Sequence, residues 1–275
     1  MKEVRVLLNA KMSFAQKRWP ASGRIPMAQS KALNSTVIRN DSLSSAVALV
    51  TGASRGIGRG IALRLAELGA AVAICGRDKS ALSAVASELK NLDARVHPQI
   101  ADVTDANDIA ALICSTEATL GPISILVNNA GVGLFGPAHE KSEADWDRLL
   151  NTNLKAVFLM SKAVAPSMIR RGSGDIVNIS SLAGRNAFAG GGIYCASKWG
   201  LQGLSACMAE DLREYGIRVS VVCPGSVATE FSGRGPKDPA KALAPADVAH
   251  AVAMILTQGP QSFLSEVHLR PVRKP

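Results

Sequence analysis

Tyrosine and charge are both scarce in this chain of 275 residues, which contains only two tyrosines. Charged residues make up 19% of the sequence and hydrophobic residues 47%. The low charge and the large apolar fraction exclude an intrinsically disordered protein. No apolar run reaches the roughly 18 residues that a membrane-spanning helix needs, so we expect no membrane span.

Paired cysteines and metal-binding motifs are also missing. The five cysteines are odd in number and form no CxxC motif, so a disulfide framework is not expected. A reducing compartment fits this pattern, and we predict a cytoplasmic protein. The four histidines lie far apart without an HExxH motif, and no metal site is predicted.

Acidic residues are nearly absent from the start of the chain. Residues 1–40 contain eight basic side chains and a single acid, Glu3, so they hold seven of the nine net positive charges. We predict a basic extension over residues 1–44, followed by one catalytic domain over 45–275. The extension is either a disordered or mis-started leader or an organelle-targeting peptide. The remaining residues are almost neutral and carry no basic motif interleaved with aromatics, so no nucleic-acid partner is predicted.

Short apolar runs alternate with helical patterns from residue 46 onward. The runs predict strands at 46–50, 71–75, 95–100, 123–127, 175–179, 217–223 and 263–269. They are mostly continuous rather than alternating, which indicates a sheet buried on both faces. The predicted fold class is α/β, with a single doubly wound, parallel, Rossmann-type sheet and helices on both faces.

A glycine-rich turn, TGASRGIG, follows the first predicted strand. Its spacing, Gly52-x-x-x-Gly56-x-Gly58, is neither GxGxxG nor a P-loop. Glycines at such a turn let the backbone approach a pyrophosphate, and the helix that follows offers free N–H groups. The turn therefore predicts a dinucleotide-binding site.

The tip of the second strand indicates which dinucleotide binds. Sites for NAD place an acid here to hold the ribose hydroxyl, whereas this chain places Gly76 and Arg77. Arginine pairs with a 2′-phosphate, and Arg55 in the glycine loop adds a second positive group. We predict NADP(H). The alternative is NAD(H), with Arg77 solvated and Asp78 on the ribose.

Seven motifs in a fixed order give the chain its resemblance to the short-chain dehydrogenase/reductase family. They are TGASRGIG (51–58), ADV (101–103), NNAG (128–131), NTNL (151–154), ISSLAG (179–184), YCASK (194–198) and PGSVAT (224–229). The resemblance implies seven parallel strands in the order 3-2-1-4-5-6-7. It also implies a set of cofactor-binding residues: Gly52, Ser54, Arg55, Gly56, Ile57, Gly58, Arg77, Asp102, Val103, Asn129, Gly131, Tyr194, Lys198, Pro224, Gly225, Val227 and Thr229.

The same resemblance implies a catalytic group of Asn153, Ser181, Tyr194 and Lys198. Tyrosine is a poor acid near pH 7, because its unperturbed pKa is about 10. Lys198 lies four residues further along the same helix face. We expect its charge, with that of an oxidised nicotinamide, to lower the pKa of Tyr194.

The other two members have supporting roles in this family. Ser181 would donate to the substrate oxygen, with Ser180 as the competing serine. Asn153 would bend its helix and bind a water that relays protons to Lys198, with Asn151 as the alternative.

The substrate is less well defined by these motifs than the reaction. The pattern is similar to 3-oxoacyl-acyl-carrier-protein reductases, and a basic rim of Arg234, Lys237 and Lys241 would suit an acyl-carrier partner. Small-carbonyl and 3-hydroxy acid dehydrogenases share the motifs, and a small-molecule carbonyl or alcohol is the minimal expectation. Phe135, Phe188 and Phe231 are candidates for an apolar wall or for the core.

Two further expectations concern the whole chain. The resemblance implies a homodimer or homotetramer, assembled through the helices of Asn153 and Tyr194 and the last strand. An alternative of another class, a non-catalytic dinucleotide-binding or redox-sensing module, is disfavoured because all four catalytic positions are intact.

Overall fold

The computed structural model describes residues 43–231 and 238–274. Most of the basic extension predicted over residues 1–44 lies outside this range, as do Arg234 and Lys237 of the predicted basic rim. The described chain is tied to the domain from its first residue, because the Leu43 amide donates to the carbonyl of Leu68 at 2.6 Å.

A parallel sheet forms the centre of the domain. Its strands follow the order β3-β2-β1-β4-β5-β6-β7, and every neighbouring pair is parallel. The bounds are Val47–Thr51 (β1), Ala71–Gly76 (β2), Val96–Ile100 (β3), Ile125–Asn128 (β4), Gly174–Ile179 (β5), Ile217–Pro224 (β6) and Glu266–Leu269 (β7). The predicted fold class, strand positions and strand order are confirmed.

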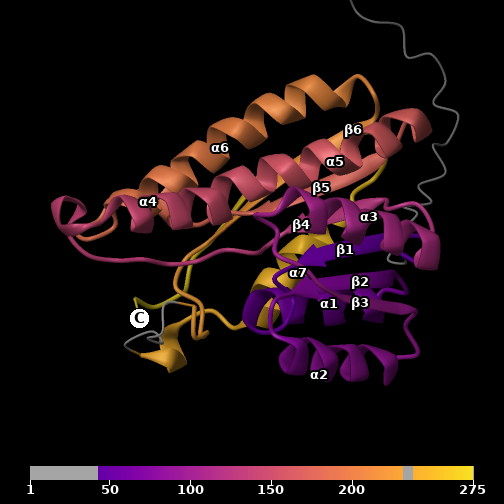
Figure 1. The fold of residues 1–275 in the computed structure, drawn as a ribbon, viewed down its shortest axis with the longest axis horizontal. Helices are drawn as coiled ribbons and strands as arrows, with labels where there is room; N and C mark the ends of the chain where they lie inside the picture. Colours follow the sequence, from indigo (N-terminus) through magenta and orange to yellow (C-terminus); the bar gives the residue numbers. More distant parts are fainter. Residues whose placement is uncertain (1–42, 232–237, 275) are drawn as a thin grey trace, which may run out of the picture. The chain divides into compact units, whose positions relative to one another are not determined.

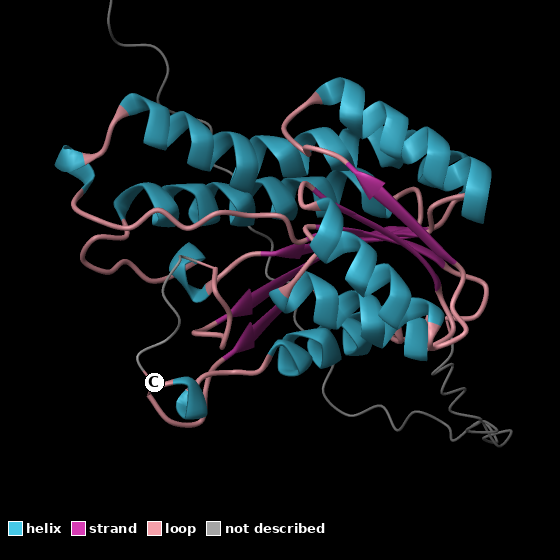
Figure 2. Ribbon diagram, turned by 60° about the horizontal axis from the view of Figure 1, so that its bottom comes forward, coloured by secondary structure: helices cyan, strands magenta, loops and turns pink. Residues whose placement is uncertain are grey.

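Helices cover both faces of the sheet (Figures 1 and 2). Their bounds are Gly56–Glu67 (α1), Lys79–Lys90 (α2), Ala106–Leu120 (α3), Glu143–Leu150 (α4), Ala156–Arg171 (α5), Gly192–Arg213 (α6) and Pro245–Leu256 (α7). Helices α1, α2 and α7 pack on one face, and α3, α5 and α6 pack on the other. Side chains fix several starts: Asp78 caps α2, Asp105 caps α3 and Ser142 forms a capping box with Asp145 at α4.

The central strands are buried along their whole length. Every residue of β1 and β4 is buried, because each face of these strands meets a helical layer. Val50 and Ile74 belong to the core under α1 and α7, whereas Leu49 and Leu126 belong to the core under α3 and α5. This two-sided burial explains the continuous apolar runs of the sequence.

Tight glycine turns lie at the edge of the sheet where the strands begin. Gly172 ends α5 with φ +67°, and Gly216 precedes β6 with φ +70°. A Cβ atom on Gly216 would lie 2.5 Å from the carbonyl oxygen of Gly172. The turns before β5 and β6 therefore touch through backbone atoms alone, and larger residues are excluded there.

Among the helices that the structure describes, none has both the length and the hydropathy needed to cross a membrane.

Candidate active site

A cavity of about 1220 Å³ runs along the edge of the sheet where the strands end. Segments that follow β1 to β6 contribute to its wall. Parallel α/β sheets bind ligands at this edge, and the volume exceeds the 300–1,000 Å³ typical of a single drug-sized ligand. The cavity has room for a dinucleotide together with a small substrate.

The glycine loop after β1 is packed against the loop after β4. Gly52 has φ +62°, and a Cβ atom there would lie 2.7 Å from the Cα of Ala130. A Cβ atom on Gly58 would lie 2.4 Å from both the Gly52 carbonyl oxygen and the Asn129 Nδ2. Both positions require glycine because of packing inside the protein. Gly58 does not line the cavity, and the structure gives it a packing role; its cofactor contact stays a prediction.

Asn129 ties these two loops together. Its Nδ2 donates to the carbonyls of Thr51 at 2.9 Å and Gly52 at 3.1 Å. In return, the Thr51 hydroxyl oxygen accepts from the amides of Asn129 and Ala130, both at 3.0 Å. Asn129 lines the cavity as predicted, and it also holds the glycine loop in place.

The start of α1 opens on the cavity. Its N-cap residue, Arg55, is extended, and its side chain accepts no hydrogen bond from the helix. Arg55 therefore does not cap the first N–H groups of α1. A Cβ atom on Gly56 would lie 3.3 Å from the Cγ2 of Thr229. The loop after β6 is thus in contact with the helix start, where an anionic group is favoured.

Arg77 and Asp102 lie together at the tips of β2 and β3. Their side chains form an ion pair of 3.6 Å between Nη1 and Oδ2, and the Arg77 side chain is 68% exposed. Burial opposes the shift, but hydrogen bonds from Thr104 and the charge of Arg77 hold the pKa of Asp102 below its usual value. Asp78 instead accepts from the Ala81 amide at 3.0 Å and caps α2.

Tyr194, Lys198 and Ser181 meet on the wall of the cavity. Tyr194 and Lys198 lie one turn apart on α6, with the Lys198 Nζ 5.9 Å from the centre of the tyrosine ring. Lys198 is buried, and its Nζ donates to the Ile179 carbonyl at 3.0 Å. Ser181 follows β5 and forms a hydrogen bond with Tyr194.

Burial controls the acidity of both α6 residues. It raises the pKa of Tyr194 to about 12, although the hydrogen bond with Ser181 acts in the opposite direction. It lowers the pKa of Lys198 to about 8. In the chain by itself the Tyr194 pKa therefore lies above its usual value, because desolvation of the phenolate is the largest effect. The predicted lowering of the pKa includes the charge of an oxidised nicotinamide, and it stays a prediction for the cofactor complex.

The two candidate serines differ in their surroundings. The Ser180 hydroxyl is buried and has no hydrogen-bond partner in the described part of the chain. The Ser181 hydroxyl accepts from the Ala183 amide at 3.1 Å, and it also contacts Tyr194. Both serines line the cavity, and the interaction with Tyr194 belongs to Ser181, the serine that the sequence analysis selects.

Asn153 lies in a π-helical turn, Asn151–Lys155, between α4 and α5. Its Oδ1 accepts from the Val132 amide at 2.8 Å, and its Nδ2 donates to the Val132 carbonyl at 2.9 Å and to the Ser197 hydroxyl at 3.2 Å. The predicted helix irregularity is present. Asn153 does not line the cavity, and both of its amide hydrogens are engaged.

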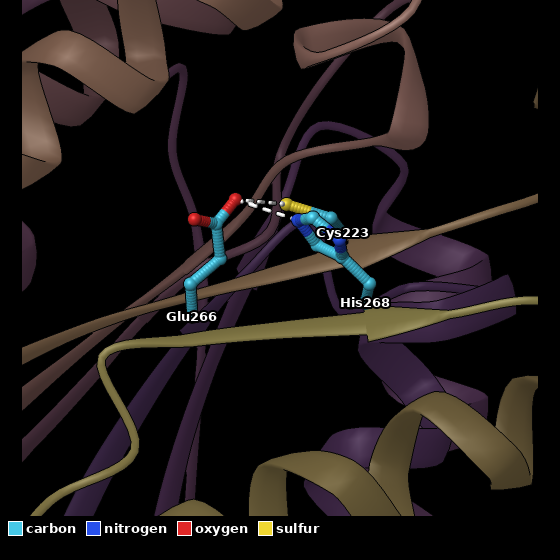
Figure 3. A group of neighbouring side chains, drawn as sticks. All are labelled: Cys223, Glu266 and His268. Atoms are coloured by element: carbon cyan, nitrogen blue, oxygen red, sulfur yellow. Dashed lines mark hydrogen bonds and ion pairs between the residues drawn. The ribbon is translucent and has the colours of Figure 1, made fainter.

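The neighbouring strands β6 and β7 carry a cluster of Cys223, Glu266 and His268 (Figure 3). The Glu266 carboxylate accepts from Arg185 at 3.0 and 2.7 Å and contacts His268 at 2.7 Å. Arg185 holds the pKa of Glu266 down at about 2. The Arg185 guanidinium already neutralises the negative charge of this carboxylate. The ion pair joins β7 to the segment that follows Ser181.

Other residues on the wall carry no motif in the sequence. Asn186, Ala187 and Arg270 line the cavity, and nothing in their local sequence distinguishes them from ordinary loop residues. Of the predicted set, the residues that line the cavity are Gly52, Ser54, Arg55, Gly56, Ile57, Arg77, Asp102, Val103, Asn129, Gly131, Ser181, Tyr194, Lys198, Pro224, Gly225, Val227 and Thr229.

Comparison with known proteins agrees with this geometry. Residues 46–239 match the family model described as short chain dehydrogenase. An uncharacterised oxidoreductase of Staphylococcus saprophyticus is 37% identical over 231 residues, which cover 84% of this chain and 99% of that protein. Gluconate 5-dehydrogenase of Gluconobacter oxydans is 42% identical over 193 residues, or 70% of this chain and 75% of that protein.

A solved structure is also similar. The crystal structure of a metagenomic short-chain oxidoreductase in complex with NADP superposes with a TM-score of 0.75 and 46% identity, covering 84% of this chain and 99% of that one. The chain therefore belongs to the short-chain dehydrogenase family and is an oxidoreductase.

Proposed function

We propose that this protein transfers a hydride reversibly between NADP(H) and a carbonyl compound or secondary alcohol. The observation that carries the proposal is the grouping of Tyr194, Ser181 and buried Lys198 on the wall of the cavity. Such a group supplies an acid, a residue that orients it and a donor for the substrate oxygen.

Tyr194 is the proton donor in this proposal. Burial raises its pKa to about 12, so the hydroxyl is protonated at neutral pH but is a weaker acid than a free tyrosine. Proton transfer is driven by the negative charge that develops on the carbonyl oxygen, because the alkoxide that hydride addition forms is more basic than the phenolate. Ser181 donates to the same oxygen and positions it. Lys198 supplies positive charge beneath the ring, and the charge favours the phenolate once the proton has left.

In this proposal Asn153 acts indirectly, through a bound water. With both amide hydrogens engaged by Val132 and Ser197, the side chain offers only its oxygen to a further partner. A water that relays protons toward Lys198 would therefore bind the remaining lone pair of this oxygen or the backbone carbonyl.

The residues at the tips of β1 to β3 suit NADP(H). Arg77 is largely exposed, and its partner Asp102 is 3.6 Å away, so the guanidinium is free to turn toward a phosphate. Asp78, the one acid that would favour NAD(H), is engaged as the cap of α2. The NADP-bound relative supports this choice. The cofactor would supply the hydride, and the glycine loop and α1 would hold its pyrophosphate.

Two groups of substrate fit this proposal. A 3-oxoacyl thioester, with an acyl-carrier partner, is one candidate; the third residue of its proposed basic rim, Lys241, is already paired with Asp238 at 2.8 Å. A small carbonyl or a 3-hydroxy acid is the other, and the gluconate 5-dehydrogenase relative fits the small-molecule class. The alternative from another functional class is a dinucleotide-binding module that catalyses no reaction.

We also propose that the chain assembles as a homodimer or homotetramer. Trp199 on α6 and Phe158 on α5 are 51% and 44% exposed, and a second copy would bury such a surface.

Substitution of Tyr194 tests the reaction. We expect Tyr194→Phe to bind NADPH normally and to lose 10²- to 10⁴-fold in kcat, as is usual when a general acid is removed. NADPH oxidation with a panel of diketones, aldehydes and 3-oxoacyl thioesters measures turnover, and Tyr215→Phe is the matched control. Near-normal turnover in Tyr194→Phe would refute the mechanism. NADPH binding without turnover of any carbonyl by the wild type would favour the binding module.

A further inference from the structure

Three phenylalanines surround Tyr194, one from each loop that follows β4, β5 and β6. The Phe135 ring lies 5.2 Å from the Tyr194 ring, edge to face, and the Phe231 ring lies 6.0 Å from it in a similar orientation. Phe188 extends the group, with its ring 6.1 Å from that of Phe135. We call Phe135, Phe188 and Phe231 the aromatic wall.

Contacts with glycine seat these rings. A Cβ atom on Gly133 would lie 2.8 Å from Phe231 and 3.1 Å from Phe135, and one on Gly191 would lie 2.6 Å from Phe188. Because Gly133 and Gly191 have no side chains, the phenylalanine rings can pack directly against their backbone. At Gly191 the space that a side chain would need is taken by the Phe188 ring.

The aromatic wall is apolar but not covered. Phe135, Phe188 and Phe231 are 42%, 49% and 44% exposed, and all three line the same cavity as Tyr194. Exposed apolar surface that is gathered in one place beside a reactive group indicates a binding surface for an apolar ligand. Ring edges and faces also favour a further aromatic ring in a tilted or offset contact.

We infer that the site prefers carbonyl compounds with an aryl or similarly flat apolar group next to the carbonyl, together with the corresponding secondary alcohols. This inference rests on the proposed function. In the reaction, the carbonyl carbon gains a hydride from NADPH and the carbonyl oxygen gains a proton from Tyr194, which gives the alcohol and NADP⁺. A polyhydroxylated substrate would leave hydroxyls unpaired against the phenyl rings.

The test compares kcat/KM for three ketones with NADPH: acetophenone, 2-butanone and 5-ketogluconate. We expect acetophenone to exceed 2-butanone by about 10- to 100-fold, the range for one added apolar group in a fitted pocket. Cyclohexyl methyl ketone separates flatness from size, and it should rank between the two.

Variants assign the preference to the aromatic wall. Phe135→Ala, Phe188→Ala and Phe231→Ala should each lower the acetophenone to 2-butanone ratio by about tenfold or more, with an unchanged Kd for NADPH. Tyr215→Ala, which removes a ring that is 49% exposed but does not line the cavity, should leave the ratio unchanged. Leucine variants replace any alanine variant whose melting temperature falls.

The outcomes separate this inference from the proposed function. Turnover that depends on Tyr194 but favours 2-butanone or 5-ketogluconate, or a ratio that none of the three variants changes, overturns the inference alone. Absence of turnover with every ketone here and with the whole panel of diketones, aldehydes and 3-oxoacyl thioesters overturns the proposed function. Calorimetric binding of 1-phenylethanol to the NADP-loaded protein then still tests the aromatic wall, and no binding, or equal binding by Phe188→Ala, would overturn the inference.

Discussion

The side chain of Lys198 is an ionisable group that the fold buries away from water. Its pKa of about 8 lies below the ordinary value of 10.5 because the ammonium group is buried. Between these two values the unfolded chain binds more protons than the folded one, so this residue makes the free energy of unfolding rise with pH. Below pH 8 the folded protein bears the full cost of the buried charge.

We expect Lys198→Met to be more stable than the wild type at pH 7 while losing activity. The gain is at most about 3 kcal/mol from the pKa difference, reduced because the Ile179 carbonyl loses its donor. It should shrink as pH rises from 8 to 10.5. Urea unfolding across this range measures it, with the exposed Lys90→Met as control. A variant that is less stable at pH 7 would contradict the assignment.

Arg77 is the residue on which the choice of cofactor depends. Replacement by aspartate removes the cation and places a negative charge near the 2′-phosphate, so Arg77→Asp should lower the ratio of kcat/KM for NADPH over NADH by at least 10- to 100-fold. Arg213→Asp, on the exposed side of α6, is the control. An unchanged ratio would show that another group reads the phosphate.

The motifs specify most of the site at the scale of single residues, but not the properties that depend on packing. Tyr194, Lys198 and Ser181 are identified by their motifs. The direction of the Tyr194 pKa shift could not be predicted, because the rings that help to bury it come from Phe135 and Phe231 on distant loops. The roles of Phe135, Phe188 and Phe231 were open for the same reason.

The π-helical turn Asn151–Lys155 is the element on which the cavity wall depends. Asn153 holds both backbone groups of Val132, and Val132 lines the cavity. Asn153→Ala would leave these groups without their partner, at a cost of about 2 kcal/mol or more.

We therefore expect Asn153→Ala to unfold at a lower temperature and to bind NADPH more weakly, as measured by calorimetry and fluorescence titration. Lys155→Ala, an exposed residue of the same turn, should behave like the wild type. If both variants had equal melting temperatures, the link to Val132 would be irrelevant to stability.

Regular elements follow from local patterns, and this turn does not. Apolar runs place β1 to β7, and the capping residues Asp78 and Asp105 mark helix starts. The π turn involves a tie between Asn153 and Val132, which are 21 residues apart. Only the resemblance to a family, and no periodicity, indicated an irregular helix there.

Exposed aromatic side chains on α5 and α6 lead to a prediction for the whole molecule. Wild-type protein should elute as a dimer or tetramer in size-exclusion chromatography with light scattering. Trp199→Glu should yield smaller species, because a carboxylate would be buried in the contact. Tyr215→Glu is the control. A monomeric wild type, or an unchanged mass in Trp199→Glu, would contradict the proposed assembly.

The sequence did not separate the outer face of α6 from its core face. Trp199 and Leu201 are both large apolar residues of α6, yet Trp199 is 51% exposed and Leu201 is fully buried. Hydrophobicity is shared by a core and a subunit contact, so the distinction needs the packed structure.

The parallel sheet separates two edges with different uses. One edge carries the cavity, and the other carries the glycine turns at Gly172 and Gly216, where chain reversal is the only task. A label or a solid support that is attached at the edge of the glycine turns would therefore not obstruct the edge that carries the cavity. A surface-immobilised or fluorescently tagged form of this enzyme, attached beside those turns, would leave the mouth of its cavity facing the solution.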